Sequence, residues 1–300
     1  MVYTVTLNPA LDYTVKVDSI KSGEINRSYD EQIFYGGKGI NVSVILTRLG
    51  IENRALGFLA GFTGKELESM LKADGIDCAF NYLESGKTRI NLKIKSAEEY
   101  EINGEGPKIG EEDIKALIKK LSAAKSGDWV VLAGAIPKSL DTNIYDKILS
   151  ELEGKGINFA VDATGELLLK SLRHRPFLIK PNRHELEDLF KVEIKTDNEA
   201  EKYAKELQRF GAKNVIVSLS GDGALLVDET GVTTRLYNAP GEVINCVGCG
   251  DTMVAGFIAG YINTMDYAYA LKLGIACGNA TAYSEGLGEK DLIEKMLSES

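Results

Sequence analysis

The chain has 300 residues, of which 44% are hydrophobic and 26% charged, so it can bury a large core in one or two domains. Its formal net charge is −9 and it has no basic run, which argues against nucleic acid or an anionic membrane surface as a main partner. No apolar stretch reaches the length of a membrane span and the first residues lack a basic signal segment, so we expect a cytoplasmic protein with no membrane partner.

Short β-branched runs alternate with amphipathic segments along most of the chain. The expected strands are Tyr3–Leu7, Arg54–Phe58, Trp129–Ala133, Asn158–Asp162, Phe177–Ile179, Val215–Leu219 and Ala224–Asp228. The expected helices are Ile40–Leu49, Lys65–Asp74, Glu111–Leu121, Thr142–Lys155, Leu167–Leu172, Glu185–Phe190, Asn198–Phe210, Met253–Asn263 and Tyr267–Tyr283. Continuous apolar strands such as Val130–Leu132 indicate a sheet buried on both faces. The alternation predicts one doubly wound α/β domain over residues 1–300, with a mainly parallel sheet flanked by helices.

Two segments, at about 12–35 and about 86–106, depart from this pattern because apolar and polar residues alternate in them. A period of two is typical of exposed antiparallel strands with one covered face. We therefore expect a small antiparallel β lid inserted into the α/β core. Because the apolar face of such a lid needs a partner, we also expect a homodimer joined through the lid strands.

The turn Gly248–Asp251 follows an apparent strand end at Glu242–Asn245 and leads into an apolar helix. Backbone amides at such a helix start bind anions, and the helix dipole favours negative charge there. If Asp251 faces a substrate hydroxyl, the turn supplies both a general base and an anion hole for a phosphoryl group. The turn alone fits equally well an aspartate that only stabilises the helix dipole.

A second glycine-rich turn, Gly36–Asn41, also runs into a helix. Lys38 offers a positive charge and Asn41 offers donors and acceptors for sugar hydroxyls, although an ordinary loop before a helix fits as well. Asp12 follows the first strand, at the sheet edge where α/β proteins bind ligands, but a turn aspartate fits there too. The chain contains neither a Walker P-loop nor a dinucleotide-binding glycine motif.

The cysteines are Cys78, Cys246, Cys249 and Cys277. Cys246 and Cys249 form a C-x-x-C, but no second such pair exists and the two histidines are far away in sequence. Two small residues in a glycine turn are therefore favoured over a zinc site or a redox centre. The helix start is expected to lower the pKa of the Cys249 thiol, and the Asp251 carboxylate opposes that shift.

Seven stretches carry a resemblance that spans nearly the whole chain. They are Thr6–Asp12, Gly36–Val42, Thr88–Asn91, Asn103–Pro107, Lys180–Leu186, Ser218–Ala224 and Val247–Phe257. In this order they resemble the motifs of the ribokinase-like, PfkB-type carbohydrate kinases. The Asn8–Asp12 and Thr88–Asn91 segments are most similar to the 1-phosphofructokinase and tagatose-6-phosphate kinase branch.

The resemblance implies roles for individual residues. Asp251 matches the general base, and the anion hole matches Gly248, Cys249 and Gly250. The sugar-binding positions match Asp12, Gly37, Lys38 and Asn41. The substrate's own phosphate is expected to meet two lid residues, Arg27 and Arg89, because a guanidinium fork suits an anion on an acidic protein.

The resemblance also implies ATP and Mg²⁺. The motif that organises the metal and the ATP phosphates matches Lys180, Asn182 and Glu185, with Glu185 expected to reach Mg²⁺ through water. The positions around the nucleotide match Ser218, Ser220, Gly221, Gly223 and Asn279.

Two features depart from the family pattern. Cysteines stand at 246 and 249, where relatives usually carry Ser and Ala, and Ala133–Pro137 lacks the serines that relatives often place there. The second difference removes a hydroxyl contact to the sugar phosphate.

The expected activity is ATP-dependent phosphorylation of a ketohexose monophosphate. Fructose 1-phosphate, giving fructose 1,6-bisphosphate, is the first choice, and tagatose 6-phosphate the second. The alternatives are a binding regulator of the same fold without catalysis and, more remotely, a redox protein that uses Cys246 and Cys249.

Overall fold

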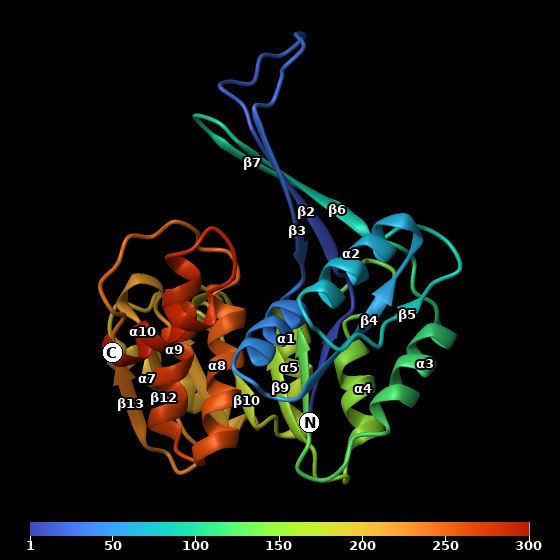
Figure 1. Cartoon of the computed structure of the whole chain (residues 1–300). Coiled ribbons are helices and arrows are strands. Elements are labelled where there is room, and N and C mark those ends of the chain that lie inside the picture. The colour runs from blue at the N-terminus through green and yellow to red at the C-terminus, as the bar shows by residue number, and fades with distance from the viewer. Residues whose placement is uncertain (300) are drawn as a thin grey trace.

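The computed structural model describes residues 1–299, and within them nine strands form one sheet through the middle of the molecule (Figure 1). In spatial order these strands are β13 (Thr233–Leu236), β12 (Ala224–Val227), β11 (Asn214–Ser218), β10 (Leu178–Ile179), β9 (Asn158–Asp162), β8 (Trp129–Ala133), β1 (Val2–Thr6), β4 (Asn53–Leu59) and β5 (Asn81–Tyr82). Neighbours from β5 to β11 run parallel, and β12 and β13 add antiparallel strands at one edge. The parallel strands therefore all end at the same edge of the sheet, where α/β proteins bind ligands.

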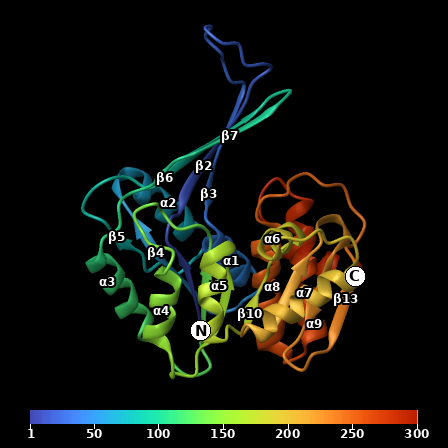
Figure 2. The same cartoon turned by 180° about the vertical axis from the view of Figure 1, so that it is seen from behind.

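Helices cover both faces of this sheet, as the two opposite views show (Figures 1 and 2). One face carries α3 (Glu111–Leu121), α4 (Ile144–Leu152), α5 (Gly165–Ser171), α6 (Arg183–Phe190) and α7 (Asp197–Arg209). The other face carries α1 (Lys38–Arg48), α2 (Gly61–Ala73), α8 (Cys249–Thr264), α9 (Tyr267–Ala282) and α10 (Lys290–Glu299). In the described part of the chain, no helix combines the length and the apolar character needed to cross a bilayer.

The central strand β8 shows why the sheet needs both helical layers. Val130 and Leu132 belong to the core beneath α3 to α7, whereas Trp129, Val131 and Ala133 belong to the core beneath α1 and α8 to α10. Side chains alternate across a strand, so an uninterrupted apolar run fills both cores at once. Each fully buried Val or Leu contributes roughly 1.5–3 kcal/mol relative to an exposed one.

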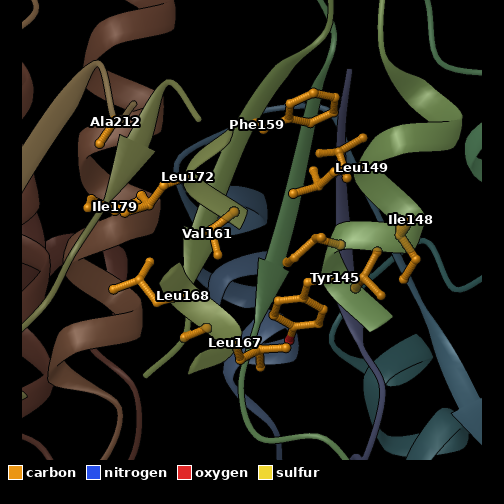
Figure 3. Packing of buried hydrophobic residues seen from close by; sticks show 14 of the residues in the cluster. Tyr145, Ile148, Leu149, Phe159, Val161, Leu167, Leu168, Leu172, Ile179 and Ala212 are labelled. Atoms are coloured by element: carbon orange, nitrogen blue, oxygen red, sulfur yellow. The ribbon is translucent and has the colours of Figure 1, made fainter. Parts of the chain in front are cut away.

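The first of these cores is densely packed around β9 (Figure 3). Tyr145 and Leu149 of α4 lie beside Phe159 and Val161 of β9, and Leu168 of α5 closes the group. Large rigid side chains on both elements hold β9 firmly, and its last residue, Asp162, is thereby fixed at the ligand-binding edge.

A second, four-stranded sheet projects from that edge, on the side away from the N-terminus (Figure 1). Its order is β3 (Asp30–Gly36), β2 (Ala10–Lys16), β6 (Arg89–Lys95) and β7 (Glu99–Asn103). The expected antiparallel pairing is found within each hairpin, β2 with β3 and β6 with β7, and the hairpins meet through a parallel pair, β2 with β6. We call this sheet the lid.

The expected doubly wound α/β fold is confirmed, and every expected helix and strand except one is present, with ends shifted by a few residues. The strand expected at Glu242–Asn245 is wrong: this segment is irregular, and Val243 and Ile244 are exposed. Strands β5 and β13 were not expected because they are short edge strands, and helix α10 was also not expected. Helix α8 begins four residues earlier than expected, at Cys249 instead of Met253, because the chain turns at Gly248.

Candidate active site

Helix α8 begins at the ligand-binding edge, directly after a glycine turn. Gly248 has a left-handed backbone with φ of 85°, which favours glycine, and it has no side chain that could cap the helix. The first amides of a helix have no acceptor within that helix. The start of α8 therefore offers the amides of Cys249 and Gly250 to an external anion.

Asp251 is the third residue of α8, but it does not cap its own helix. It is 6% exposed, and its Oδ2 atom accepts a hydrogen bond from Nδ2 of Asn41 on α1 at 2.8 Å. An aspartate that served only the dipole would be solvated or bonded to the nearby amides. Its burial and its contact across 210 positions favour a general base over a helix-capping residue.

The start of helix α1 packs directly on the end of β1. A Cβ atom at Gly37, where φ is 138°, would lie 2.7 Å from Thr6 Cγ2, and one at Gly39 would lie 2.6 Å from Thr6 Oγ1. The glycines of this turn are thus needed for close packing, and this packing places Lys38 and Asn41 beside Asp251.

Asp162 joins these residues from the end of β9, and sequence reasoning did not single it out. Its side chain is 3% exposed, and Oδ2 lies 3.0 Å from Nζ of Lys38 while Oδ1 lies 3.7 Å from Nζ of Lys180. The only available signal was a polar residue ending an apolar central strand. We call Lys38, Asp162, Lys180 and Asp251 the charge cluster.

The charges in this cluster shift one another's pKa. Burial raises the pKa of Asp251, the Asp162 carboxylate raises it further, and Lys38, Asn41 and Lys180 lower it, so that it lies at about 6. For Asp162 burial also works against ionisation, but Lys180 and Lys38 outweigh it and hold the pKa of Asp162 below its usual value. Burial opposes the Lys38 ammonium, yet Asp162 and Asp251 outweigh that effect and raise the pKa of Lys38. At neutral pH, Asp251 is thus ionised yet close to the range in which it accepts a proton.

Lys180 also faces the start of α8. A Cβ atom added at Gly250 would lie only 2.8 Å from Nζ of Lys180. The ammonium group is buried with its residue, which is 6% exposed. Positive charge and open amides therefore meet at one place, which suits a phosphate group that carries several negative charges.

The base of the lid holds two more of the expected residues. Asp12 on β2 accepts a hydrogen bond from Nδ2 of Asn91 at 2.8 Å and pairs with Nζ of Lys93 at 3.2 Å. Arg89, at the start of β6, donates from Nε to the backbone oxygen of Asn8 at 3.1 Å. Burial lowers the pKa of Arg89 and Asp12 partly offsets this, but a guanidinium stays charged at neutral pH.

Arg27 is not brought to the site within one chain. It is exposed in the loop 17–29 between β2 and β3, and this loop is the part of the lid that projects furthest from the main sheet (Figure 1). The predicted contact of Arg27 with a sugar phosphate is therefore not formed by this protomer on its own site.

Most of the expected nucleotide positions lie just beyond the carboxyl ends of β10 and β11. These two ends lie side by side, since the amide of Ser218 donates to the oxygen of Pro181 at 3.0 Å and Asn182 forms a parallel β-bridge with Ser218. Ser220 and Gly221 follow in a 3-10 turn that ends at Gly223, where φ is 97°.

A cleft of about 450 Å³ lies between the loop after β13, helix α9 and the end of α10. Asn238, in its wall, donates from Nδ2 to the oxygen of Ser220 at 2.9 Å, and Ile275 lines the α9 side. Asn279 lies one helical turn beyond Ile275 and is 4% exposed, and its Nδ2 atom has no hydrogen-bond partner among residues 1–299. A buried donor without a partner suits a ligand with acceptor atoms.

Asn182 and Glu185 form the cap of helix α6. Oδ1 of Asn182 accepts from the amide of Glu185 at 2.7 Å, and Oε2 of Glu185 accepts from the amide of Asn182 at 2.8 Å. No group of three or more His, Cys, Asp or Glu residues in the described chain could hold a metal alone. One fixed carboxylate still fits Mg²⁺, which commonly takes one or two carboxylates together with phosphate oxygens and water.

The expectation for Cys249 is wrong. Burial raises the pKa of its thiol to about 11, and Cys246 and Asp251 add to the effect. The sulfur faces the backbone oxygen of Asn245 at 3.6 Å rather than the open helix start. Burial thus outweighs the helix dipole at this position.

Comparison with known proteins agrees with this geometry. The sequence pattern of the pfkB family carbohydrate kinases matches residues 5–294. The 1-phosphofructokinase of Bacillus subtilis (strain 168) is 44% identical over 300 residues, which are 100% of this chain and 98% of that protein. The D-tagatose-1-phosphate kinase of Bacillus licheniformis is 35% identical and covers 100% of this chain and 98% of its own length.

Proteins with lower sequence identity to this chain are also named as sugar-phosphate kinases. The tagatose-6-phosphate kinase of Staphylococcus epidermidis is 32% identical over 96% of this chain and 94% of its own length. Among solved structures, phosphofructokinase-2 from Escherichia coli in complex with substrates and products superposes with a TM-score of 0.93. That protein is 28% identical and is matched over 99% of this chain and 98% of its own.

The thiol environment predicts an order of reactivity. Because Cys249 has a pKa of about 11 and Cys246 is exposed, iodoacetamide near neutral pH should modify Cys246 at least ~10-fold faster than Cys249. Peptide mass spectrometry over a time course measures both rates. In the Cys246→Ser variant, Cys249 should remain slow. Labelling of Cys249 as fast as Cys246 would contradict the buried environment described for it.

Proposed function

Because this chain belongs to the pfkB family of carbohydrate kinases, we propose that it transfers the γ-phosphoryl group of ATP to a ketohexose monophosphate. The proposed substrate is fructose 1-phosphate and the product is fructose 1,6-bisphosphate. The observation that carries the proposal is Asp251: a buried carboxylate in the first turn of α8, beside open amides and two lysines.

The proposed reaction uses these groups as follows. Asp251 accepts the proton of the sugar hydroxyl, and the hydroxyl oxygen bonds to the γ-phosphorus of ATP. The bond from that phosphorus to the bridging oxygen breaks, and ADP leaves with the electron pair. The amides of Gly248 to Gly250 and the Lys180 ammonium face the negative charge on the transferring group. Burial of Asp251 keeps water from competing for the carboxylate.

The sugar is proposed to bind between the charge cluster and the base of the lid. The carboxylate of Asp12 is fixed by Asn91 and Lys93 and can accept hydrogen bonds from sugar hydroxyls. Arg89, next to Asp12 and half-buried, is proposed to hold the phosphate that the substrate already carries. Relatives named 1-phosphofructokinase and D-tagatose-1-phosphate kinase support a phosphate at position 1 of the substrate, and tagatose 6-phosphate is the second candidate.

The nucleotide is proposed to lie along the turn 218–223, with its base in the cleft beside α9. Asn279, one helical turn beyond Ile275 on α9, has a buried Nδ2 without a partner among residues 1–299 and is proposed to meet the nucleotide. Glu185 would hold Mg²⁺ through water, and the ion would neutralise charge on the phosphate oxygens when bound.

The alternative of a regulator without catalysis is disfavoured by the residues present at the site. A binding protein needs neither a buried base with a pKa of about 6 nor two lysines facing it. A redox role for Cys246 and Cys249 is disfavoured by the burial and raised pKa of Cys249. The four free thiols fit the cytoplasmic location that we propose.

We also propose that two copies associate through the lid. Leu11 and Tyr35, at its base, pack against the core formed with α2, but further out no element within residues 1–299 covers the same apolar face. Ile33 is 51% exposed and Ile102 is 60% exposed. A lid-to-lid dimer would cover these side chains and would carry Arg27 of one protomer toward its partner's site.

A coupled ADP-release assay tests the proposed reaction. Fructose 1-phosphate should give the highest kcat/KM. The kcat/KM should be lower by a factor of roughly ten or more for tagatose 1-phosphate, tagatose 6-phosphate, fructose 6-phosphate and unphosphorylated ketoses. NMR of the product locates the new phosphate. Absence of ADP release with every sugar would favour the regulator, and a preference for a tagatose phosphate would change the substrate.

The base assignment predicts the effect of Asp251→Asn. The amide keeps the shape and the contact with Asn41 but cannot accept the proton, so kcat should fall by ~10²–10⁴. ATP affinity, measured by calorimetry, and the unfolding temperature should change little. A variant that keeps more than about a tenth of wild-type kcat would show that another group is the base.

Arg89→Ala should selectively weaken sugar binding. Hydrogen bonds to charged groups are worth roughly 1.5–3 kcal/mol, so the KM for the sugar phosphate should rise about ten- to a hundredfold while the KM for ATP stays the same. Arg54→Ala is a suitable control, because Arg54 pairs with Asp77 at the opposite edge of the sheet. Equal losses for both substrates would argue that Arg89 supports the fold or the nucleotide instead.

The dimer is tested by charging the apolar lid face. Ile102→Lys should shift the protein from dimer to monomer in sedimentation velocity, because it would bury an unpaired ammonium in the interface. Glu101 lies on the other face of β7, so the control variant Glu101→Lys should leave the dimer intact. A wild-type protein that sediments as a monomer at micromolar concentration would end this proposal.

A further inference from the structure

Asp162 lies at the centre of the charge cluster, although the sequence motifs assign it no role. Its carboxylate touches Lys38 at 3.0 Å through one oxygen and Lys180 at 3.7 Å through the other. Its negative charge also raises the pKa of Asp251. Asp162 therefore contacts both lysines of the cluster and acts electrostatically on its other carboxylate.

The cluster is electrically balanced, with two lysines and two aspartates. Asp162 and Lys180 are almost completely buried, whereas Lys38 is about a third exposed at the mouth of the site. A buried charge requires a partner, and removing one member leaves another uncompensated. Without Asp162, both ammonium groups would have Asp251 as their remaining carboxylate in the cluster.

That change would affect the reaction at Asp251. A carboxylate held by two ammonium groups binds a proton weakly and offers few free lone pairs. The present arrangement prevents this, because Lys38 bonds to Asp162 while Asp251 accepts from the neutral Asn41. The hydrogen bond that Asp251 accepts therefore comes from a neutral amide, and Lys38 is bonded to Asp162 instead.

We propose that Asp162 is a positioning residue, which holds Lys38 and Lys180 away from Asp251 so that Asp251 can accept the proton of the sugar hydroxyl. The proposal rests on the kinase function proposed above. Asp162 touches neither the sugar nor the transferring phosphoryl group in this role; it acts through the two lysines and through its own negative charge.

The charged and titratable groups around Asp162 come from every element packed against it. Lys38 begins α1, Lys180 follows β10, Asp251 lies in α8, Glu185 in α6 acts on Lys38 from a distance, and Tyr145 lies in α4. Burial and the charge of Asp162 raise the pKa of Tyr145, whose hydroxyl donates to the oxygen of Gly134 at 3.0 Å, so Tyr145 stays neutral. The group that gains a proton as the pH falls toward about 6 is therefore Asp251.

The test is the pH dependence of kcat/KM for the best sugar phosphate, at saturating ATP and Mg²⁺. Wild-type activity should fall as the pH drops below about 6, because Asp251 is then protonated. Asp162→Asn removes a charge that raises the pKa of Asp251, so the acidic limb should move to lower pH by about one unit. The plateau kcat should fall roughly tenfold, because the lysines move toward the base.

Lys180→Met should move the limb in the opposite direction, to higher pH, because Lys180 lowers the pKa of Asp251. Asp77→Asn, at the opposite edge of the sheet, is the matched loss of a carboxylate and should leave the limb and the plateau unchanged. An acidic limb that does not move in Asp162→Asn, or that moves upward, would overturn the proposal. A variant whose only change is a higher requirement for Mg²⁺ would do the same.

Asp162→Asn leaves the buried ammonium group of Lys180 and the half-buried one of Lys38 with one carboxylate; if this variant fails to fold, thermal unfolding reveals it. The charge-balanced double variant Asp162→Asn/Lys180→Met then carries the test. The acidic limb of its pH profile should lie at lower pH than that of Lys180→Met alone. Acidic limbs at the same pH in the two variants would overturn the proposal. A wild-type enzyme that releases no ADP would refute the proposed function, whereas an active wild type with unmoved limbs would refute only the role of Asp162.

Discussion

The structure depends on one constraint: opposite charges buried at the end of a parallel sheet must find each other. Lys38, Asp162, Lys180 and Asp251 come from segments far apart in sequence, and burial of Asp162 and Lys180 is tolerable only because they pair, while the buried Asp251 is held by Asn41. The pairing requires β9 and β10 to end side by side, with the starts of α1 and α8 above them. The apolar core beneath α4 and α5 holds β9 in that position (Figure 3).

The cluster separates two regions with different chemistry. On one side lie the lid base and Asp12, with polar groups suited to a sugar. On the other lie the turn 218–223 and the cleft beside α9, suited to a nucleotide. The open amides at the start of α8 stand between them. A phosphoryl group can therefore pass from one region to the other with little movement of the protein, which is what positioning contributes to phosphoryl transfer.

Much of this could be predicted from the sequence because the signals are local. Apolar runs and periodicity predict the α/β layers, and the glycine turn before Asp251 predicts a helix start at this point of the chain. The Glu242–Asn245 strand was predicted wrongly because β-branched residues there lie on the surface with no neighbouring strand among residues 1–299. Strands β5 and β13 are too short to produce a period.

The rest depends on long-range contacts. Asp162 carries no motif, and its importance follows only from the two lysines that the fold brings to it. The raised pKa of Cys249 depends on how deeply the thiol is buried, which a helix-start argument does not contain. The remoteness of Arg27 depends on the length and direction of the lid hairpin. These are properties of packing, and a local pattern does not encode them.

The most direct test of the central claim is a crystal structure of the protein with fructose 1-phosphate, Mg²⁺ and a non-hydrolysable ATP analogue. The acceptor hydroxyl should lie within about 3 Å of the Asp251 carboxylate, with the γ-phosphate facing the amides of Gly248 to Gly250. An acceptor hydroxyl placed beside a different group, with Asp251 still bonded only to Asn41, would contradict it.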